Sequence, residues 1–302
     1  TPPLANIDAP ANNSYLHGTT EIEVTGQDAN FNRTELCING KLAATWNING
    51  VNTYQWNTTA FPDGTYTLSL KVYDNANNFA TDEISVTVDN TPPIAEIRTP
   101  AASDFVKGRY NITIFGYDAN LQVIQLSVED SSITAWLSNG IHSFLWDASS
   151  INGSRIIMLK VYDKAGTKTE RTVTVTVDNT LPLVTITKPQ AGAELSGTTT
   201  INFVALDTNL KSVQLLIDQS TFNVTGTTSY QWDTTKVGDG THIIKLLAYD
   251  KAGNKAEYLV SVNTVNSKLI LEANRNLYLI IGTALGFMFG ILIAYIILKR
   301  EK

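Results

Sequence analysis

Cysteine and histidine are scarce in this chain. Its 302 residues include one cysteine, Cys37, and three histidines. A single cysteine cannot form an intrachain disulfide, so each domain must be held together by its apolar core. No Cys or His cluster has the spacing of a metal site, and no glycine-rich phosphate loop follows a predicted strand. We therefore expect no enzymatic activity from these residues.

Basic charge is also low. The chain has 22 Lys and Arg against 28 Asp and Glu, a net charge of −6, and three of the basic residues lie among the last four. Proteins that bind nucleic acid need clustered Lys and Arg to contact phosphates. We therefore expect no nucleic-acid partner.

Charged residues are absent from one long stretch, residues 277–298, which is followed by the tail Lys299, Arg300, Glu301 and Lys302. As a helix, the stretch would span about 33 Å, enough to cross a bilayer core of about 30 Å. We interpret it as a single transmembrane helix with a cytoplasmic tail at 299–302, because basic residues favour the inner side. This interpretation makes membrane lipid a partner and places the preceding chain outside the cell.

Small residues recur at every fourth position of that stretch. They are Gly282, Gly286, Gly290 and Ala294. Such spacing lines one helix face and lets two backbones approach closely, which predicts self-association of the helix, although glycine is common in membrane helices in any case.

Helical periodicity is lacking before the apolar stretch, and a repeat of about 89 residues takes its place. The repeats begin with Thr-x-Pro, and we assign domains at 1–90, 91–179 and 180–266, followed by a connector at 267–276. A second proline follows at Pro10, Pro100 or Pro189. We expect these prolines to fix the entry to a first strand and to keep it from pairing as an edge.

Apolar residues within each repeat alternate with polar ones, as in strands that bury one face. Ile22 and Val24 flank Glu23, for example, and Leu68, Leu70 and Val72 follow the same period. Several short strands separated by Gly, Asn and Asp turns predict an all-β fold of three tandem two-sheet sandwiches. One tryptophan per repeat is expected in the core: Trp56, Trp146 and Trp232.

Several segments carry a family resemblance. They are Tyr-Gln-Trp-Asp-Thr-Thr at 230–235, the Asp239-Gly240-Thr241-His242 turn, the turn at 249–254 and the Val-Asp-Asn-Thr-Pro linker. They resemble bacterial and archaeal Ig-like domains of surface proteins, over about residues 1–266. The resemblance implies the Ig-like fold, but such modules occur in adhesins, envelope stalks and enzyme appendages alike. The second repeat departs from the pattern at 152–155 and 163–167, and the first at Asn77 and Asn78.

Acidic and amide side chains are predicted to meet at the domain junctions. In an Ig-like sandwich the entry strand, the loop between the second and third strands, and the last hairpin turn lie at one end. This arrangement groups Asp89, Asn90, Asp118, Asn120 and Asp163 at the first junction, and Asp178, Asn179, Asp207, Asn209 and Asp250 at the second. Oxygen ligands suit calcium, so we hypothesise calcium-stiffened junctions. The alternative is that these side chains only bond to their own turns.

Two further features concern modification. Asn-x-Ser/Thr sequons occur at Asn12, Asn32, Asn57, Asn111, Asn152 and Asn223, which makes them glycosylation candidates if the host has the machinery. Cys37 is expected to point outward from its strand, either as an incidental small residue or as a partner in a cross-chain disulfide.

These expectations describe a membrane-anchored surface stalk or adhesin of a prokaryote, structural or adhesive and not catalytic, with an unidentified protein or glycan partner. Two alternatives stay open. One is the membrane stalk of an extracellular hydrolase. The other is a receptor for carbohydrate or peptide that uses the tip of the first repeat, around Asp28, Asn30 and Asp74. Because Thr1 is itself a Thr-Pro-Pro start, we also expect a further domain before it.

Overall fold

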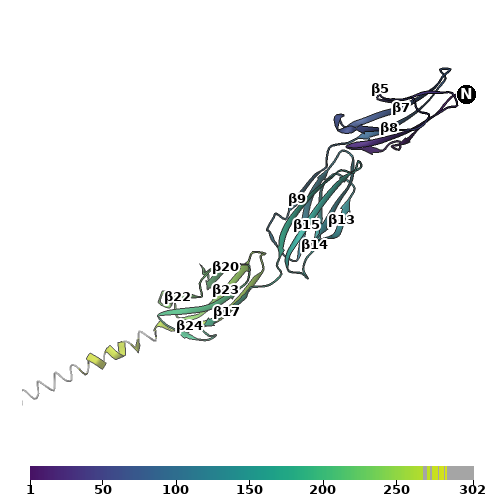
Figure 1. Cartoon of the computed structure of the whole chain (residues 1–302). Coiled ribbons are helices and arrows are strands. Elements are labelled where there is room, and N and C mark those ends of the chain that lie inside the picture. Colours follow the sequence, from purple (N-terminus) through teal and green to yellow (C-terminus); the bar gives the residue numbers. More distant parts are fainter. Residues whose placement is uncertain (268–270, 273, 278, 282, 284–302) are drawn as a thin grey trace, which may run out of the picture. The chain divides into compact units, whose positions relative to one another are not determined.

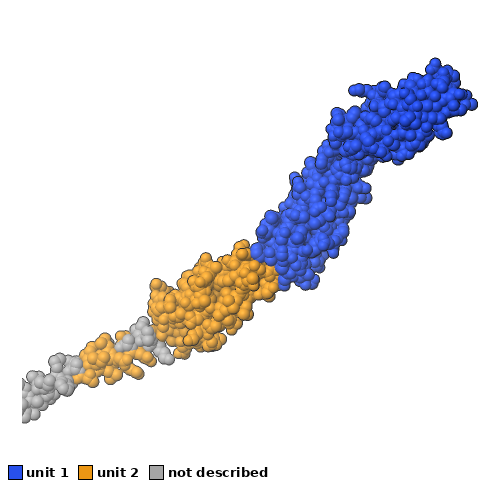
Figure 2. Space-filling view, viewed as in Figure 1, with its two compact units in different colours: residues 1–177 blue, residues 178–302 orange. Residues whose placement is uncertain are grey.

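The computed structural model consists of β-sandwiches and describes residues 1–267, 271–272, 274–277, 279–281 and 283 (Figure 1). The chain divides into two compact units, residues 1–177 and residues 178–302 (Figure 2). Unit 1 contains two sandwiches and unit 2 contains one, so the prediction of three tandem all-β Ig-like domains is confirmed.

The first sandwich packs a three-stranded sheet, β1-β3-β6, against a five-stranded sheet, β2-β8-β7-β4-β5. A short 3₁₀ turn, η1 (Thr58–Ala60), follows β6. The strands are β1 (Leu4–Ala9), β2 (Tyr15–Leu16), β3 (Thr19–Gln27), β4 (Phe31–Ile38), β5 (Lys41–Trp46), β6 (Gly50–Asn57), β7 (Gly64–Asp74) and β8 (Phe79–Val88).

The second sandwich repeats this topology with sheets β14-β11-β9 and β10-β16-β15-β12-β13. Its strands are β9 (Ile94–Thr99), β10 (Phe105–Val106), β11 (Arg109–Tyr117), β12 (Leu121–Val128), β13 (Ser131–Trp136), β14 (Gly140–Asp147), β15 (Gly153–Asp163) and β16 (Lys168–Val177).

The third sandwich has sheets β17-β19-β22 and β18-β24-β23-β20-β21. Another 3₁₀ turn, η2 (Thr234–Lys236), follows β22. Its strands are β17 (Leu183–Lys188), β18 (Glu194–Leu195), β19 (Thr198–Leu206), β20 (Leu210–Ile217), β21 (Ser220–Asn223), β22 (Ser229–Asp233), β23 (Gly240–Asp250) and β24 (Lys255–Thr264).

Each sandwich has its own core, built by the alternation seen in the sequence. Ile22, Val24, Leu68, Leu70 and Val72 are all fully buried in the first sandwich. The three tryptophans are buried as well, with exposed fractions of 1% for Trp56, 7% for Trp146 and 6% for Trp232. Cores of this kind supply the stability that a disulfide-free domain requires.

The second proline of each repeat does not lie where we expected. Pro10, Pro100 and Pro189 come directly after the first strand instead of at its entry. There the chain leaves the three-stranded sheet and crosses to the five-stranded one, where a two-residue strand pairs in parallel with the last strand of the sandwich. A proline suits this crossing because it has no N–H to contribute to either sheet.

The predicted membrane helix at 277–298 and the tail at 299–302 lie largely outside the described residues. Within the described part, residues 266–267, 271–272, 274–277, 279–281 and 283 have helical backbone. None of the helices in the described part is both long enough and apolar enough to cross a membrane. Gly282, Gly286, Gly290 and Ala294 fall outside the described residues, so their role in helix association stays a prediction.

A prediction about the fold concerns Gly116 on β11. A Cβ atom at this position would lie 2.5 Å from Cδ1 and 2.8 Å from Cγ1 of Ile124, which is fully buried. Gly116→Ala should therefore lower the free energy of unfolding of unit 1 by about 1–3 kcal/mol through overpacking. Urea denaturation measures the change.

Gly238→Ala is the matched control, because a Cβ atom added there would meet no neighbouring atom within 4 Å. It should leave stability unchanged. Equal stability of the two variants would contradict the tight packing of β11 against β12.

Candidate metal centres

Two loops of the second sandwich and its entry segment meet at one end of the domain. Asp89 directly follows β8, Asp118 directly follows β11, and Asp163 is the last residue of β15. The tight turns after β11 and β15 hold their aspartates in place: Asp118 Oδ1 accepts from the Asn120 N–H at 2.7 Å, and Asp163 Oδ1 accepts from the Thr167 N–H at 2.7 Å. Such Asx turns are what the sequence chemistry favours here.

The three carboxylates form one cluster. Asp89, Asp118 and Asp163 each offer an oxygen, and these oxygens all lie within 4.8 Å of one another. Two oxygens on opposite sides of a calcium ion, each about 2.4 Å away, are about 4.8 Å apart. The cluster therefore has the size of one calcium coordination sphere.

The cluster is buried and carries concentrated negative charge. Asp89, Asp118 and Asp163 are 3%, 4% and 0% exposed. Burial, together with the negative charges of Asp89, Asp163 and Asp63, raises the pKa of Asp118, although a backbone hydrogen bond from Asn120 opposes the shift. The ion pairs found within unit 1 involve other carboxylates. An oxygen-seeking cation would relieve this repulsion.

A hollow of about 200 Å³ adjoins the cluster and is lined by Asp89, Asp118 and Asn120 among others. Asn120 Nδ2 donates to Asp89 Oδ2 at 2.8 Å, which links the first sandwich to the second. Within the described part of unit 1, no donor reaches the other oxygen of Asp89 or Oδ2 of Asp118. These two oxygens, which belong to buried residues, are therefore available to an ion.

The same arrangement recurs in unit 2. Asp178, Asp207 and Asp250 place one oxygen each within 4.8 Å of the others. Asn209 Nδ2 donates to Asp178 Oδ2 at 2.7 Å, and its N–H donates to Asp207 Oδ1 at 2.6 Å. Oxygen-only donor sets of this kind suit calcium and do not suit zinc, which prefers nitrogen and sulfur.

The predicted amides divide into two groups. Asn120 and Asn209 join the clusters. The Asn90 side chain instead fastens the first sandwich, where its Oδ1 accepts from the Gly18 N–H at 3.0 Å and from the Thr58 hydroxyl at 3.0 Å. Asn179 is half-buried and occupies the corresponding position of the second repeat.

Sequence reasoning missed the residues that brace the acidic turns. Asn254 donates through Nδ2 to Asp250 Oδ2 at 2.6 Å and to the Asp178 carbonyl at 2.8 Å, and Thr167 donates its hydroxyl to Asp163. Asn139 bonds to both the N–H and the carbonyl of Asp118. Asn254 and Thr167 each lie four residues after an aspartate, and Asn139 lies on the turn that faces Asp118. These positions are the sequence signal from which the bracing contacts could have been predicted.

A complete triad is absent at the far end of the first sandwich and after the third sandwich, in the part of the chain that the structure describes. In the first sandwich Asp28 and Asp74 hold the same turns, accepting from the N–H groups of Asn30 at 2.7 Å and Asn78 at 2.9 Å. After the third sandwich, Val265 stands where Asp89 and Asp178 stand in the earlier repeats. A complete triad in the described residues therefore needs an aspartate that directly follows the last strand of the preceding repeat.

The glycosylation candidates lie on the surface. Asn12, Asn57, Asn111, Asn152 and Asn223 are exposed and Asn32 is half-buried. Cys37 is also half-buried, on β4. Neither observation assigns a modification to these residues.

Two family models of bacterial Ig-like domains match parts of the chain. A bacterial Ig domain model matches residues 3–70 and 182–246, and a bacterial Ig-like domain (group 3) model matches residues 50–135. The search of curated proteins found no match.

Similar solved structures share low identity with the chain. The I67–I69 fragment of titin is 14% identical and covers 88% of this chain and 99% of its own, with a TM-score of 0.46. A tetra-tandem repeat from the extending region of a large adhesion protein is 17% identical and covers 87% and 74%, with a TM-score of 0.32. Fibronectin(III)-like modules of Clostridium thermocellum CbhA are 18% identical and cover 57% and 94%, with a TM-score of 0.39.

The raised pKa of Asp118 predicts a pH-dependent effect of Asp118→Asn when calcium is chelated. A carboxyl with a raised folded-state pKa stabilises the fold below its unfolded pKa, and that stabilisation is lost as pH rises through the folded pKa. The variant cannot ionise but keeps an acceptor for the Asn120 N–H. It should gain stability over the native chain as pH rises from 3 to 7.

Urea titrations at several pH values with chelator present measure this difference. A difference that does not change with pH would contradict the charge repulsion.

Proposed function

Because the chain carries tandem bacterial Ig-like domains of the kind found in adhesion or surface proteins, we propose that it is a membrane-anchored cell-surface spacer whose domain junctions are stiffened by calcium. Its role is structural and adhesive, without catalysis. The observation that carries the proposal is the acidic triad assembled from Asp89, at the exit of one sandwich, and Asp118 and Asp163, on two loops of the next.

The position of the triad gives the ion a mechanical role. Asp89 belongs to the segment about which the first sandwich would turn against the second, whereas Asp118 and Asp163 are fixed by their turns. A cation held by all three would resist rotation at this segment. Binding of an ion would therefore restrict the bending of one sandwich against the next.

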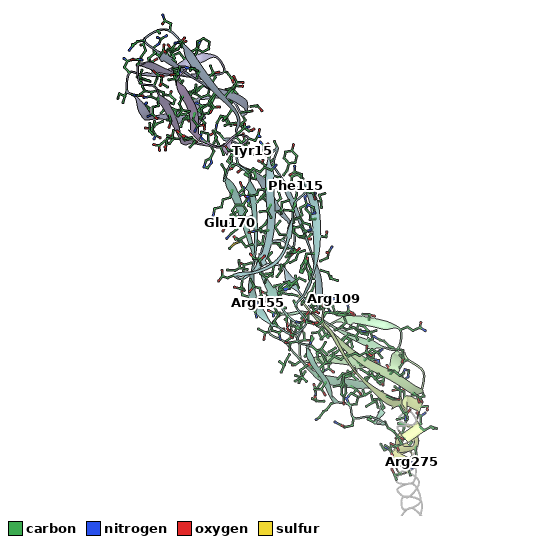
Figure 3. The ribbon with its side chains drawn as sticks, turned by 90° about the vertical axis from the view of Figure 1, so that its right-hand side faces the viewer. Tyr15, Arg109, Phe115, Arg155, Glu170 and Arg275 are labelled. Atoms are coloured by element: carbon green, nitrogen blue, oxygen red, sulfur yellow. The ribbon has the colours of Figure 1, made fainter. Side chains whose placement is uncertain are left out.

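Direct contacts at the same junction support this role. His17 Nδ1 lies 2.5 Å from the Ala165 carbonyl, and the Lys164 ammonium lies 5.1 Å from the centre of the Tyr15 ring, labelled in Figure 3. These contacts come from the edge of the first sandwich and from the hairpin turn that follows Asp163. They orient the two sandwiches so that Asp89 reaches the cluster.

The placement at a membrane rests on the sequence. The uncharged stretch 277–298 and the basic tail at 299–302 favour a C-terminal anchor with the sandwiches outside the cell.

Calcium binding is tested on residues 1–266, which contain all three cores. Calorimetry should find two calcium ions per native chain and one for Asp118→Asn. With a Kd of about 10⁻⁴ M, about 10 mM calcium should stabilise unit 1 by about 2.7 kcal/mol. The same solutions should show reduced bending by small-angle scattering.

Asp147→Asn is the matched control, because Asp147 accepts from the Ser149 N–H at 3.1 Å on an exposed turn and does not join the triad. It should still bind two ions. No binding heat and an unchanged melting temperature with calcium would refute the proposed junction site.

Anchoring is tested in cells of a prokaryotic host that secretes the chain behind a signal peptide. The full chain should sediment with membranes and be cut by protease added outside the cells, whereas a chain ending at residue 276 should be released into the medium. Protection of the sandwiches from external protease would contradict the proposed orientation.

A further inference from the structure

The third sandwich contains an open groove that the metal centres do not involve. It has a volume of about 600 Å³ and lies between β21 and β22, the edge strands of the two sheets. Three aromatic side chains line it, Phe222, Tyr230 and Trp232, together with the polar residues Gln219 and Ser220. Small-molecule sites typically have volumes of about 300–1,000 Å³ and combine apolar walls with a few polar groups.

The groove is open because this sandwich lacks a ring that covers the core tryptophan of the first. There Phe61 packs edge-on against Trp56, with a centroid distance of 5.4 Å. Phe61 directly follows η1, and in the third sandwich Val237 directly follows the corresponding turn, η2. The smaller Val237 leaves Trp232 on the groove wall.

Trp232 brings an indole N–H donor to this wall, and its side chain is 6% exposed. The indole nitrogen of Trp56, in contrast, is sealed from solvent and has no hydrogen-bond partner. A buried indole N–H usually finds a partner, and a ligand in the groove would supply one.

An aromatic platform crosses the groove. The rings of Phe222 on β21 and Tyr230 on β22 are 4.6 Å apart between centroids and tilted by 35°. Phe222 pairs with Leu215 in the register where Ala44 pairs with Leu36 and Thr134 pairs with Leu126. The second sandwich has a different pair across the corresponding edge strands, with Trp136 of β13 stacked on His142 of β14 at 4.9 Å. A ring at the position of Phe222 is therefore what distinguishes the third sandwich from the other two.

The charged groups around the groove each have a partner. His242 Nδ1 lies 2.6 Å from Asp218 Oδ2, and Lys236 Nζ lies 3.5 Å from Asp233 Oδ2. An anion or a cation would have to break one of these pairs. Other polar groups that line the groove are uncharged, among them the Tyr230 hydroxyl and the side chains of Gln219 and Ser220.

We propose that this groove is a binding site for a neutral oligosaccharide. A sugar ring has an apolar C–H face that packs on an aromatic ring, and a rim of hydroxyls that both donate and accept hydrogen bonds. The Phe222–Tyr230 platform supplies the apolar surface, and the Trp232 indole, the Tyr230 hydroxyl and Gln219 supply uncharged partners. The proposal does not depend on calcium, because the groove and the triad of unit 2 share no residue.

The test uses the full 302-residue chain in a detergent without a sugar headgroup. Cellohexaose, mannohexaose, xylohexaose, laminarihexaose and maltohexaose are titrated separately, to about 5 mM, with tryptophan fluorescence and calorimetry as readouts. At least one should bind with a millimolar or lower Kd. Phe222→Ala should weaken that binding at least tenfold.

Val237→Phe is the second variant. It tests the groove without removing a side chain from the domain, so a loss of binding cannot be ascribed to unfolding. Because Phe61 fills the same position in the first sandwich, the added ring should be accepted while it closes the groove over Trp232. It should abolish sugar binding and keep the melting temperature. Phe79→Ala, which removes an exposed aromatic of the first sandwich, is the matched control and should bind as the native chain does.

Three outcomes would overturn the proposal. One is that none of the five oligosaccharides binds. Another is that binding survives both Phe222→Ala and Val237→Phe. The third is that binding is lost in Phe79→Ala but kept in Phe222→Ala, which would move the site to the first sandwich.

Discussion

Concentrated negative charge at the junctions is the constraint on which the rest of the structure depends. Asp89, Asp118 and Asp163 are almost completely removed from water and lie within 4.8 Å of one another. Like charges in such a place oppose folding unless they are protonated or neutralised by a cation. The surrounding turns, braced by Asn120 and Thr167, hold the carboxylates together instead of letting them separate. A sandwich that only needed turn stability could have left these side chains facing solvent.

Much of the fold could be predicted because it follows from local periodicity repeated three times. Alternating residues such as Ile22 and Val24 define buried faces without reference to the rest of the chain. The prediction for Pro10 was wrong, since a proline can stand at either end of a strand and only the pairing of β2 with β8 decides which. Pairing between strands that are distant in sequence cannot be predicted from a local pattern.

The candidate sites were predictable to different degrees. The aspartates of both triads could be grouped because they occupy fixed places in a known domain topology. Their bracing partners, such as Asn254, required the actual turn conformations. The groove beside Trp232 depends on what is missing, namely the bulk of a ring like Phe61 at position 237. A cavity arises from the sum of side-chain volumes across two sheets, which no single stretch of sequence displays.

The places where the repeats agree and differ separate two kinds of role. The turns that present Asp118 and Asp207 recur, as expected for residues that every junction needs. The lining of the edge between β21 and β22 differs from that of the first sandwich, because a ring is present at Phe222 and another is absent at Val237. This exchange leaves the partly buried rings of Phe222 and Tyr230 along the groove, and a bound ligand would remove their remaining apolar surface from water.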